Sequence, residues 1–182
     1  DSENNYYIYT KGNITYTGLG DSYNLTDDEI KLFINTMISA YRAPASDPYI
    51  SVLNEDAQTS GTTTTMYLDE TQTGTNVQIQ VNDASLSDIN RSYSLQVFSM
   101  NGDTDKADIT SQVSGLTLSN GTYQAQNGGV YSFGVSSSQL ANTNEVKYHV
   151  VLKSSYNVNS KTINTSKDYY ISVMAMPFFD LY

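Results

Sequence analysis

The chain has 182 residues, no cysteine, and a net charge of −10 from 9 basic and 19 acidic residues. The missing cysteines exclude disulfides, thiolate metal sites and cysteine nucleophiles together. Because the basic residues form no cluster, the composition predicts no binding to nucleic acid and no attraction to an anionic membrane surface. Charged residues make up only 15% of the chain, against about 25% in an average soluble domain. Asn, Ser, Thr and Tyr take their place, a surface typical of proteins that work outside cells.

The N-terminal region combines an extended segment with the one helix that the sequence predicts. Residues Tyr6–Tyr16 are rich in Tyr, Ile and Thr, which indicates a kinked strand or a small hairpin. Thr26 and Glu29 have the spacing of a capping box, in which each side chain satisfies a backbone N–H at the start of a helix. From residue 30 to residue 41 the apolar positions recur at i, i+3, i+4, i+7, i+8 and i+11, as on one stripe of a helix. We therefore predict a helix over residues 27–41.

Everything after Pro48 reads as short strands bounded by Asn, Gly, Asp or Ser. In Val77–Val81 and Tyr131–Val135, for example, apolar and polar residues alternate, which gives a strand one dry and one wet face. The predicted strands are Tyr49–Leu53, Thr62–Leu68, Asn76–Val81, Tyr93–Met100, Gly115–Leu118, Thr122–Gln126, Val130–Val135, Glu145–Ser154 and Asp168–Met176. This pattern predicts a mainly β fold, an antiparallel sandwich of immunoglobulin-like or jelly-roll type. We expect residues 49–182 to form the sandwich and residues 1–48 to pack on it, within a single structural domain.

One stretch of the chain resembles a known kind of module. Asp108-Ile109-Thr110-Ser111, followed by Asn127-Gly128 and by Tyr131-Ser132-Phe133-Gly134-Val135, is similar to immunoglobulin-like β-sandwich modules of bacterial surface proteins. The resemblance covers residues 108–135, and Gly129 is an extra residue in its second motif. It implies a sandwich fold and a surface location, and it carries no catalytic site. Such modules serve as stalks, adhesins or filament subunits, and phage virion proteins use the same architecture.

The residue types that most enzymes need are scarce. His149 is the single histidine, so the chain cannot supply a histidine pair for a metal, and we expect this residue to be solvated on a strand face that it shares with Lys147 and Lys153. The adjacent carboxylates are Asp27-Asp28, Glu55-Asp56 and Asp69-Glu70. They keep a carboxylate-based hydrolase as a third hypothesis, but neighbours along a strand point to opposite faces, and a helix start or a solvated loop explains them more simply. We predict that the chain is not an enzyme.

The sequence predicts no cofactor, with one weaker alternative. Asp103, Asp105 and Asp108 bring three carboxylates into one loop, and hard oxygen ligands at such spacing can hold Ca²⁺. Lys106 stands among them and no Glu closes the loop, so the EF-hand pattern is not met. A polar hairpin tip is the simpler interpretation of this segment.

The two terminal segments are the candidate contact regions. Tyr6, Tyr7, Ile8 and Tyr9 are apolar on both faces of an extended segment, and Phe178, Phe179, Leu181 and Tyr182 follow a last strand that is equally apolar. Exposed segments of this kind aggregate unless they are covered. They either fold back over their own core or add as a strand to a neighbouring subunit. We name these eight residues as the predicted assembly interface.

These observations predict a non-enzymatic extracellular structural protein. The first hypothesis is a surface filament subunit, such as a pilin, or a virion subunit, whose partners are copies of itself or other surface or virion proteins. The alternative is a monomeric adhesin or carbohydrate-binding module that contacts glycans. The chain begins at Asp1 and has no apolar run near the roughly 18 residues of a membrane span. We therefore expect a mature chain at the cell surface or in a virion, without membrane insertion.

Overall fold

The computed structural model describes residues 8–11, 14–17, 26–42, 47–68, 72–85, 90–141, 143–158 and 160–176; the side chains of residues 8–17, 38–42 and 158 fall outside this description. The chain divides into two compact units. One contains residues 1–47 and 84–88, and the other contains residues 48–83 and 89–182. The expected packing of residues 1–48 on the sandwich stays a prediction.

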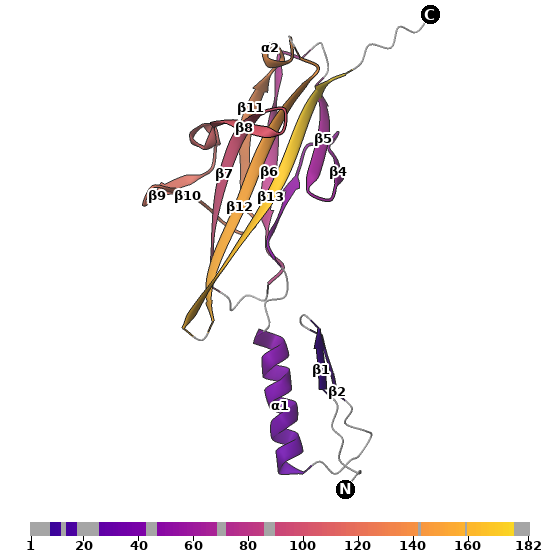
Figure 1. The fold of residues 1–182 in the computed structure, drawn as a ribbon, viewed down its shortest axis with the longest axis vertical. Helices are drawn as coiled ribbons and strands as arrows, with labels where there is room; N and C mark the ends of the chain where they lie inside the picture. Colours follow the sequence, from indigo (N-terminus) through magenta and orange to yellow (C-terminus); the bar gives the residue numbers. More distant parts are fainter. Residues whose placement is uncertain are drawn as a thin grey trace, which may run out of the picture. The chain divides into compact units, whose positions relative to one another are not determined.

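The first unit contains a hairpin and a helix (Figure 1). β1 (Ile8–Lys11) pairs antiparallel with β2 (Ile14–Thr17), so the hairpin alternative is the one that forms. α1 spans Asp27–Arg42, one residue longer than predicted. The capping box is present, because Thr26 N donates to Glu29 Oε2 at 2.5 Å and Glu29 N donates to Thr26 Oγ1 at 3.4 Å. The helix start therefore follows from local side-chain chemistry alone.

The second unit is a β-sandwich made of a large and a small sheet (Figure 1). The small sheet has the order β11-β6-β3, with β3 at Tyr49–Val52, β6 at Gly74–Asn82 and β11 at Val130–Ser136. The large sheet has the order β4-β5-β13-β12-β7-β10-β9, with β8 also paired to β7. Its strands are β4 (Gln58–Ser60), β5 (Thr63–Leu68), β7 (Arg91–Asn101), β8 (Thr104–Asp108), β9 (Thr117–Ser119), β10 (Thr122–Ala125), β12 (Glu145–Val158) and β13 (Lys161–Ala175). A 3-10 turn, η1 (Thr110–Gln112), and a short helix, α2 (Ser137–Leu140), complete the unit.

The core lies between the facing sides of these two sheets. The alternating apolar residues predicted from the sequence supply it: Val77, Ile79 and Val81 of β6 and Tyr131, Phe133 and Val135 of β11 are all buried. The large sheet contributes Met66, Leu95, Val97, Tyr148, Val150, Leu152, Ile171 and Val173. The predicted sandwich is therefore confirmed. One pair departs from the antiparallel expectation, because β13 runs parallel to β5.

Two asparagine amides prolong the pairing of the central strand β6. Asn54, just after β3, accepts from Gln78 N and donates to Asn76 O, both at 2.9 Å. Asn127 bonds to Asp83 in the same way: its side-chain amide accepts from the Asp83 backbone N–H at 2.8 Å and donates to the Asp83 carbonyl oxygen at 3.1 Å. Each side-chain amide acts here as a substitute peptide group, so a backbone donor and acceptor remain satisfied beyond the last strand residue.

The first motif of the sequence resemblance has a structural role in the turn after β8. Asp108 Oδ1 accepts from Thr110 N at 2.8 Å and from Thr110 Oγ1 at 2.5 Å. The same buried hydroxyl oxygen accepts from Val97 N at 2.9 Å, which ties the turn after β8 to β7. The Asp-x-Thr motif is thus a device that satisfies backbone groups where the chain leaves the sheet.

The second motif closes the turn before β11. Tyr131 reaches back so that its hydroxyl oxygen accepts from Gln126 N at 2.7 Å. A Cβ at residue 129 would lie 2.8 Å from Tyr131 Cζ, so only glycine fits beneath the ring. Gly129, the extra residue of the motif, is therefore required by the tyrosine that follows it.

Candidate functional site

The predicted assembly residues are placed only in part. Tyr6, Tyr7, Phe178, Phe179, Leu181 and Tyr182 lie outside the described residues. Ile8 and Tyr9 belong to β1, but their side chains are outside the description. The interface that we predicted from these eight residues therefore stays a prediction, and the surfaces that could receive such segments must be found on the sandwich.

Among the described strands, the longest stretch without a partner on one side is one half of β13. β12 and β13 pair along their whole length, from Glu145↔Met174 to Val158↔Lys161. On its other side β13 pairs with β5 only from Tyr170 to Ala175. Among the described strands none pairs with that side of residues 161–168. We call this stretch, Lys161–Asp168 seen from the side away from β12, the β13 edge.

Four residues of the β13 edge turn their backbone groups outward. Tyr170 N donates to Thr62 O at 2.9 Å and Met176 N donates to Leu68 O at 3.0 Å, so even-numbered residues face the β5 side. Because the direction alternates along a strand, the backbone groups of Thr162, Asn164, Ser166 and Asp168 face the open side. Their side chains are exposed as well. The edge can therefore accept a further strand.

A shorter open edge lies on the small sheet. β3 pairs with β6, and among the described residues it has no second partner strand. Leu53 N donates to Gln78 O at 2.8 Å, so Ile50 and Val52 direct their backbone groups away from β6. Two residues offer about half the pairing length of the β13 edge, which makes β3 the weaker acceptor.

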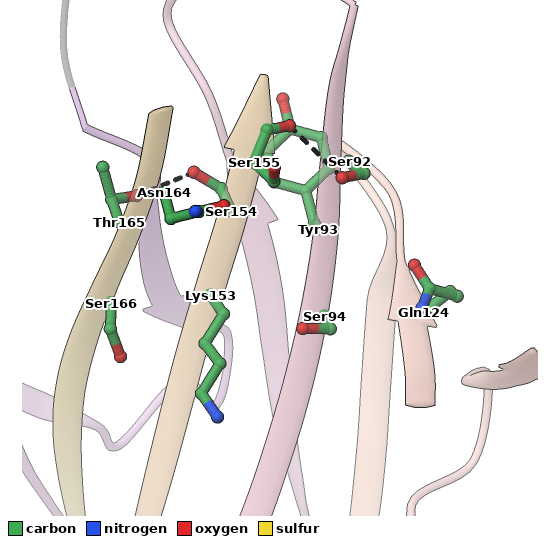
Figure 2. A pocket seen from close by; sticks show the side chains of 10 residues that line it. All are labelled: Ser92, Tyr93, Ser94, Gln124, Lys153, Ser154, Ser155, Asn164, Thr165 and Ser166. Carbon is green, nitrogen blue, oxygen red and sulfur yellow. Dashed lines mark hydrogen bonds between the residues drawn. The ribbon is translucent and has the colours of Figure 1, made fainter. Parts of the chain in front are cut away.

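A polar trough crosses the large sheet beside the β13 edge (Figure 2). It has a volume of about 400 Å³, and its walls come from β7, β10, β12 and β13. Figure 2 shows Ser92, Ser94, Lys153, Asn164 and Ser166 among its lining side chains. The residues described as lining it carry hydroxyl, amide or ammonium groups and no carboxylate. The trough can form hydrogen bonds with a polar ligand, but it lacks the acid pair of a glycosidase.

His149 is less solvated than its position on the outer face suggested. Its side chain is 15% exposed and lies between the rings of Phe98 and Tyr170, stacked on Tyr170 with ring centres 5.0 Å apart. Nδ1 lies 2.9 Å from Asp105 Oδ1 and Nε2 lies 3.0 Å from Asp168 Oδ1. Carboxylates only accept hydrogen bonds. Each contact is therefore a hydrogen bond when the ring nitrogen that faces the carboxylate carries a proton. The arrangement links β8, β12 and β13.

The three carboxylates weighed for calcium face three different partners. Asp105 contacts His149, Asp108 contacts Thr110, and Asp103 lies 3.9 Å from Lys147 Nζ. Within the part of the chain that the structure describes, no group of three acidic or histidine side chains is arranged to hold a metal ion. The calcium alternative stays a prediction.

The adjacent carboxylates are equally dispersed. Asp27 and Asp28 occupy the first turn of α1, where the helix dipole favours negative charge. Asp56 accepts a hydrogen bond from Tyr67 N at 3.0 Å, which anchors a turn before β4. Asp69 and Glu70 lie outside the described residues.

Sequence reasoning missed a buried ionic cluster at one end of the core. Arg91 Nη1 lies 2.9 Å from Asp83 Oδ2, and the two side chains are only 1% and 3% exposed. Tyr93 donates its hydroxyl to the same oxygen at 2.5 Å, and the guanidinium lies 4.5 Å from the ring centre of Tyr156. In the sequence, the only sign of this cluster is Arg91, a single arginine at the start of a strand. Burial, followed by the hydrogen bond to Asp83, raises the pKa of the Tyr93 hydroxyl.

These buried tyrosines predict a loss of stability in alkali. Burial also raises the pKa of Tyr148 above its usual value. Above about pH 10 the unfolded chain loses these protons while the folded chain keeps them, so the free energy of unfolding should fall as pH rises. Each such group contributes a slope of at most about 1.4 kcal/mol per pH unit. Urea unfolding followed by circular dichroism between pH 8 and 12 measures it. Tyr93→Phe should make the slope shallower, and an unchanged slope would contradict the assignment.

The described residues of the second unit thus form a β-sandwich around one hydrophobic core. In the described residues no helix is long and apolar enough to cross a membrane. No family model matches the chain, and no curated protein sequence matches it.

Solved structures do match. AggA, the major subunit of aggregative adherence fimbriae type I from Escherichia coli, aligns over 72% of this chain and 97% of its own, with 8% identity and a TM-score of 0.51. At this identity the likeness concerns the fold alone. The endo-β-1,4-mannanase from Thermotoga petrophila aligns over 84% of this chain and 25% of its own, with 14% identity and a TM-score of 0.36. The CooA pilin subunit from enterotoxigenic Escherichia coli aligns over 70% and 99%, with 8% identity and a TM-score of 0.26. The TM-scores of the last two structures are too low to support a conclusion about the fold.

Proposed function

We propose that this chain is a non-enzymatic subunit of an extracellular surface filament, held together by strand addition between copies. The observation that carries the proposal is the β13 edge, a run of outward-facing backbone groups in a chain whose terminal segments are strongly apolar. Main-chain hydrogen bonds to an added strand satisfy such an edge, and apolar side chains of that strand extend the core. The fold shared with AggA supports the proposal, since that protein is a fimbrial major subunit.

The test is the association state of the full chain. Size-exclusion chromatography with light scattering and negative-stain microscopy should reveal oligomers or filaments, and deletion of residues 177–182 or 1–17 should return monomers. A control variant with Leu118→Ser, at an exposed position on β9, should assemble normally. A full-length protein that stays a compact monomer at high concentration would end this proposal.

The polar trough favours a second candidate function, a monomeric adhesin or carbohydrate-binding module. Its hydroxyl and amide groups suit the hydroxyls of a sugar (Figure 2). A glycan array followed by chemical-shift mapping distinguishes this function from the first, because only binding in the trough moves signals of Ser94, Gln124 and Lys153, which lie away from the β13 edge. An array without hits would count against it.

A further inference from the structure

The β13 edge is the strongest candidate for a specific interaction surface, and its shape limits what can occupy it. This inference rests on the proposed function and names the two surfaces that meet. The outward-facing backbone groups of the edge run from Thr162 to Asp168, seven residues that provide about 23 Å of pairing length at roughly 3.3 Å per residue. A partner must therefore be an extended segment of about six or seven residues.

The terminal segment 177–182 fits this length but cannot reach the edge of its own subunit. It follows Met176, which is bonded to Leu68, at the far end of β13. From Met176 back to Asp168 the strand covers eight residues, about 26 Å. Six residues span at most about 22 Å even when fully extended. In addition, β5 already occupies that side of β13 from Tyr170 to Ala175. Any copy of this segment on the β13 edge must come from another subunit.

The side chains of the two surfaces are compatible. In an extended segment Phe179 and Leu181 fall on one face, while Asp180 falls on the other. Ile163 and Thr165, both half-buried, lie on the core side of β13, in line with the buried Tyr169 and Ile171. Phe179 and Leu181 of an added strand would extend this apolar row.

Charge limits which strands can add to the edge. The edge carries Lys161 and Lys167 on the side of Ile163 and Asp168 on the other side, and charged residues on an open edge discourage unselective pairing.

We propose that the β13 edge of one subunit accepts residues 177–182 of a second subunit as an additional strand. The contact is head-to-tail: each copy offers one edge and one segment, so successive copies extend into an open chain unless the rotation between them closes a ring. The Tyr6–Tyr9 segment is then free for another role.

Cysteine pairs test the contact directly, because the native chain contains no cysteine. Full-length Ser166→Cys protein is mixed with full-length Asp180→Cys protein, whose cysteine lies on the same outer face as residue 166 in the proposed pairing, and the mixture is mildly oxidised. We expect disulfide-linked dimers that contain one copy of each variant, identified by mass spectrometry. The matched control is Ser119→Cys, an exposed serine on β9 at the opposite border of the sheet. It should yield at least tenfold less of the mixed dimer.

A backbone variant provides the second measurement. Ser166→Pro removes an outward-facing N–H without touching the pairs between β12 and β13. It should abolish assembly, whereas Ser166→Ala, which keeps the N–H, should assemble as the native chain does. Circular dichroism checks that both variants are folded.

The outcomes separate this inference from the proposed function. Filaments that persist in Ser166→Pro, or mixed dimers that form with Tyr7→Cys and not with Asp180→Cys, overturn the pairing proposed here and leave the filament role standing. A monomeric full-length chain that gives no cross-link at any of these positions removes both.

Discussion

Replacing Asp83 with alanine should lower the free energy of unfolding of the sandwich by about 3–5 kcal/mol, because the change leaves a buried guanidinium without its carboxylate. The two side chains are 1% and 3% exposed, so water cannot take over the lost contact. Tyr93 loses the acceptor of its hydroxyl at the same time. Urea unfolding at pH 7, followed by circular dichroism and by tyrosine fluorescence, measures the effect.

Two comparisons show whether the cost arises from the uncompensated charge. The double variant with Asp83→Leu and Arg91→Met removes both charges and should recover most of the loss, since a buried pair is often replaceable by apolar residues. Asp103→Ala removes a carboxylate that lies 3.9 Å from Lys147 at an exposed position, and it should leave stability unchanged. A double variant as unstable as Asp83→Ala would contradict the electrostatic explanation.

The features predicted correctly from the sequence are those with local causes. The capping box of Thr26 and Glu29 and the apolar stripe behind it determine the helix without help from the rest of the chain. Alternation in Val77–Val81 and Tyr131–Val135 is likewise local, and it correctly indicated which residues face the core. When one face of a strand is buried and the other is exposed, apolar and polar residues alternate along the sequence.

The long hairpin of β12 and β13 was underestimated for a physical reason. Residues 155–167 are rich in Ser, Asn, Thr and Lys, which are typical of turns. They are strands nevertheless, because fourteen pairs join β12 to β13 in one continuous register. Beyond the core this part of the hairpin has little to bury, so no hydrophobic pattern marked it. The β13 edge, which is the candidate site, lies in that stretch.

Pairing between distant strands also lies beyond what local pattern shows. Nothing in Thr63–Leu68 distinguishes a parallel from an antiparallel neighbour, yet β5 runs parallel to β13. The ion pair between Asp83 and Arg91 joins the two ends of the segment that connects β6 to β7. Each residue alone resembles an ordinary surface charge. Such features emerge only once the strands have been assigned to their sheets.

Replacing Phe133 with alanine is the second change expected to have a large effect. Its ring lies 4.8 Å from that of Tyr148, so one side chain of β11 packs against one of β12 and joins the two sheets across the core. Phe133 is 2% exposed, and truncation of such a residue costs about 3–5 kcal/mol through lost burial and the cavity left behind. Urea unfolding at neutral pH provides the measurement.

The control for Phe133 lies on the same strand. Val130→Ala shortens an apolar side chain that is half exposed, and it should change stability by no more than about 0.5 kcal/mol. Phe133→Leu should fall between the two, because it keeps most of the buried volume and loses only the ring contact. If Phe133→Ala cost no more than Val130→Ala, the two sheets could not be packed face to face through this ring, and the sandwich assignment would fail with it.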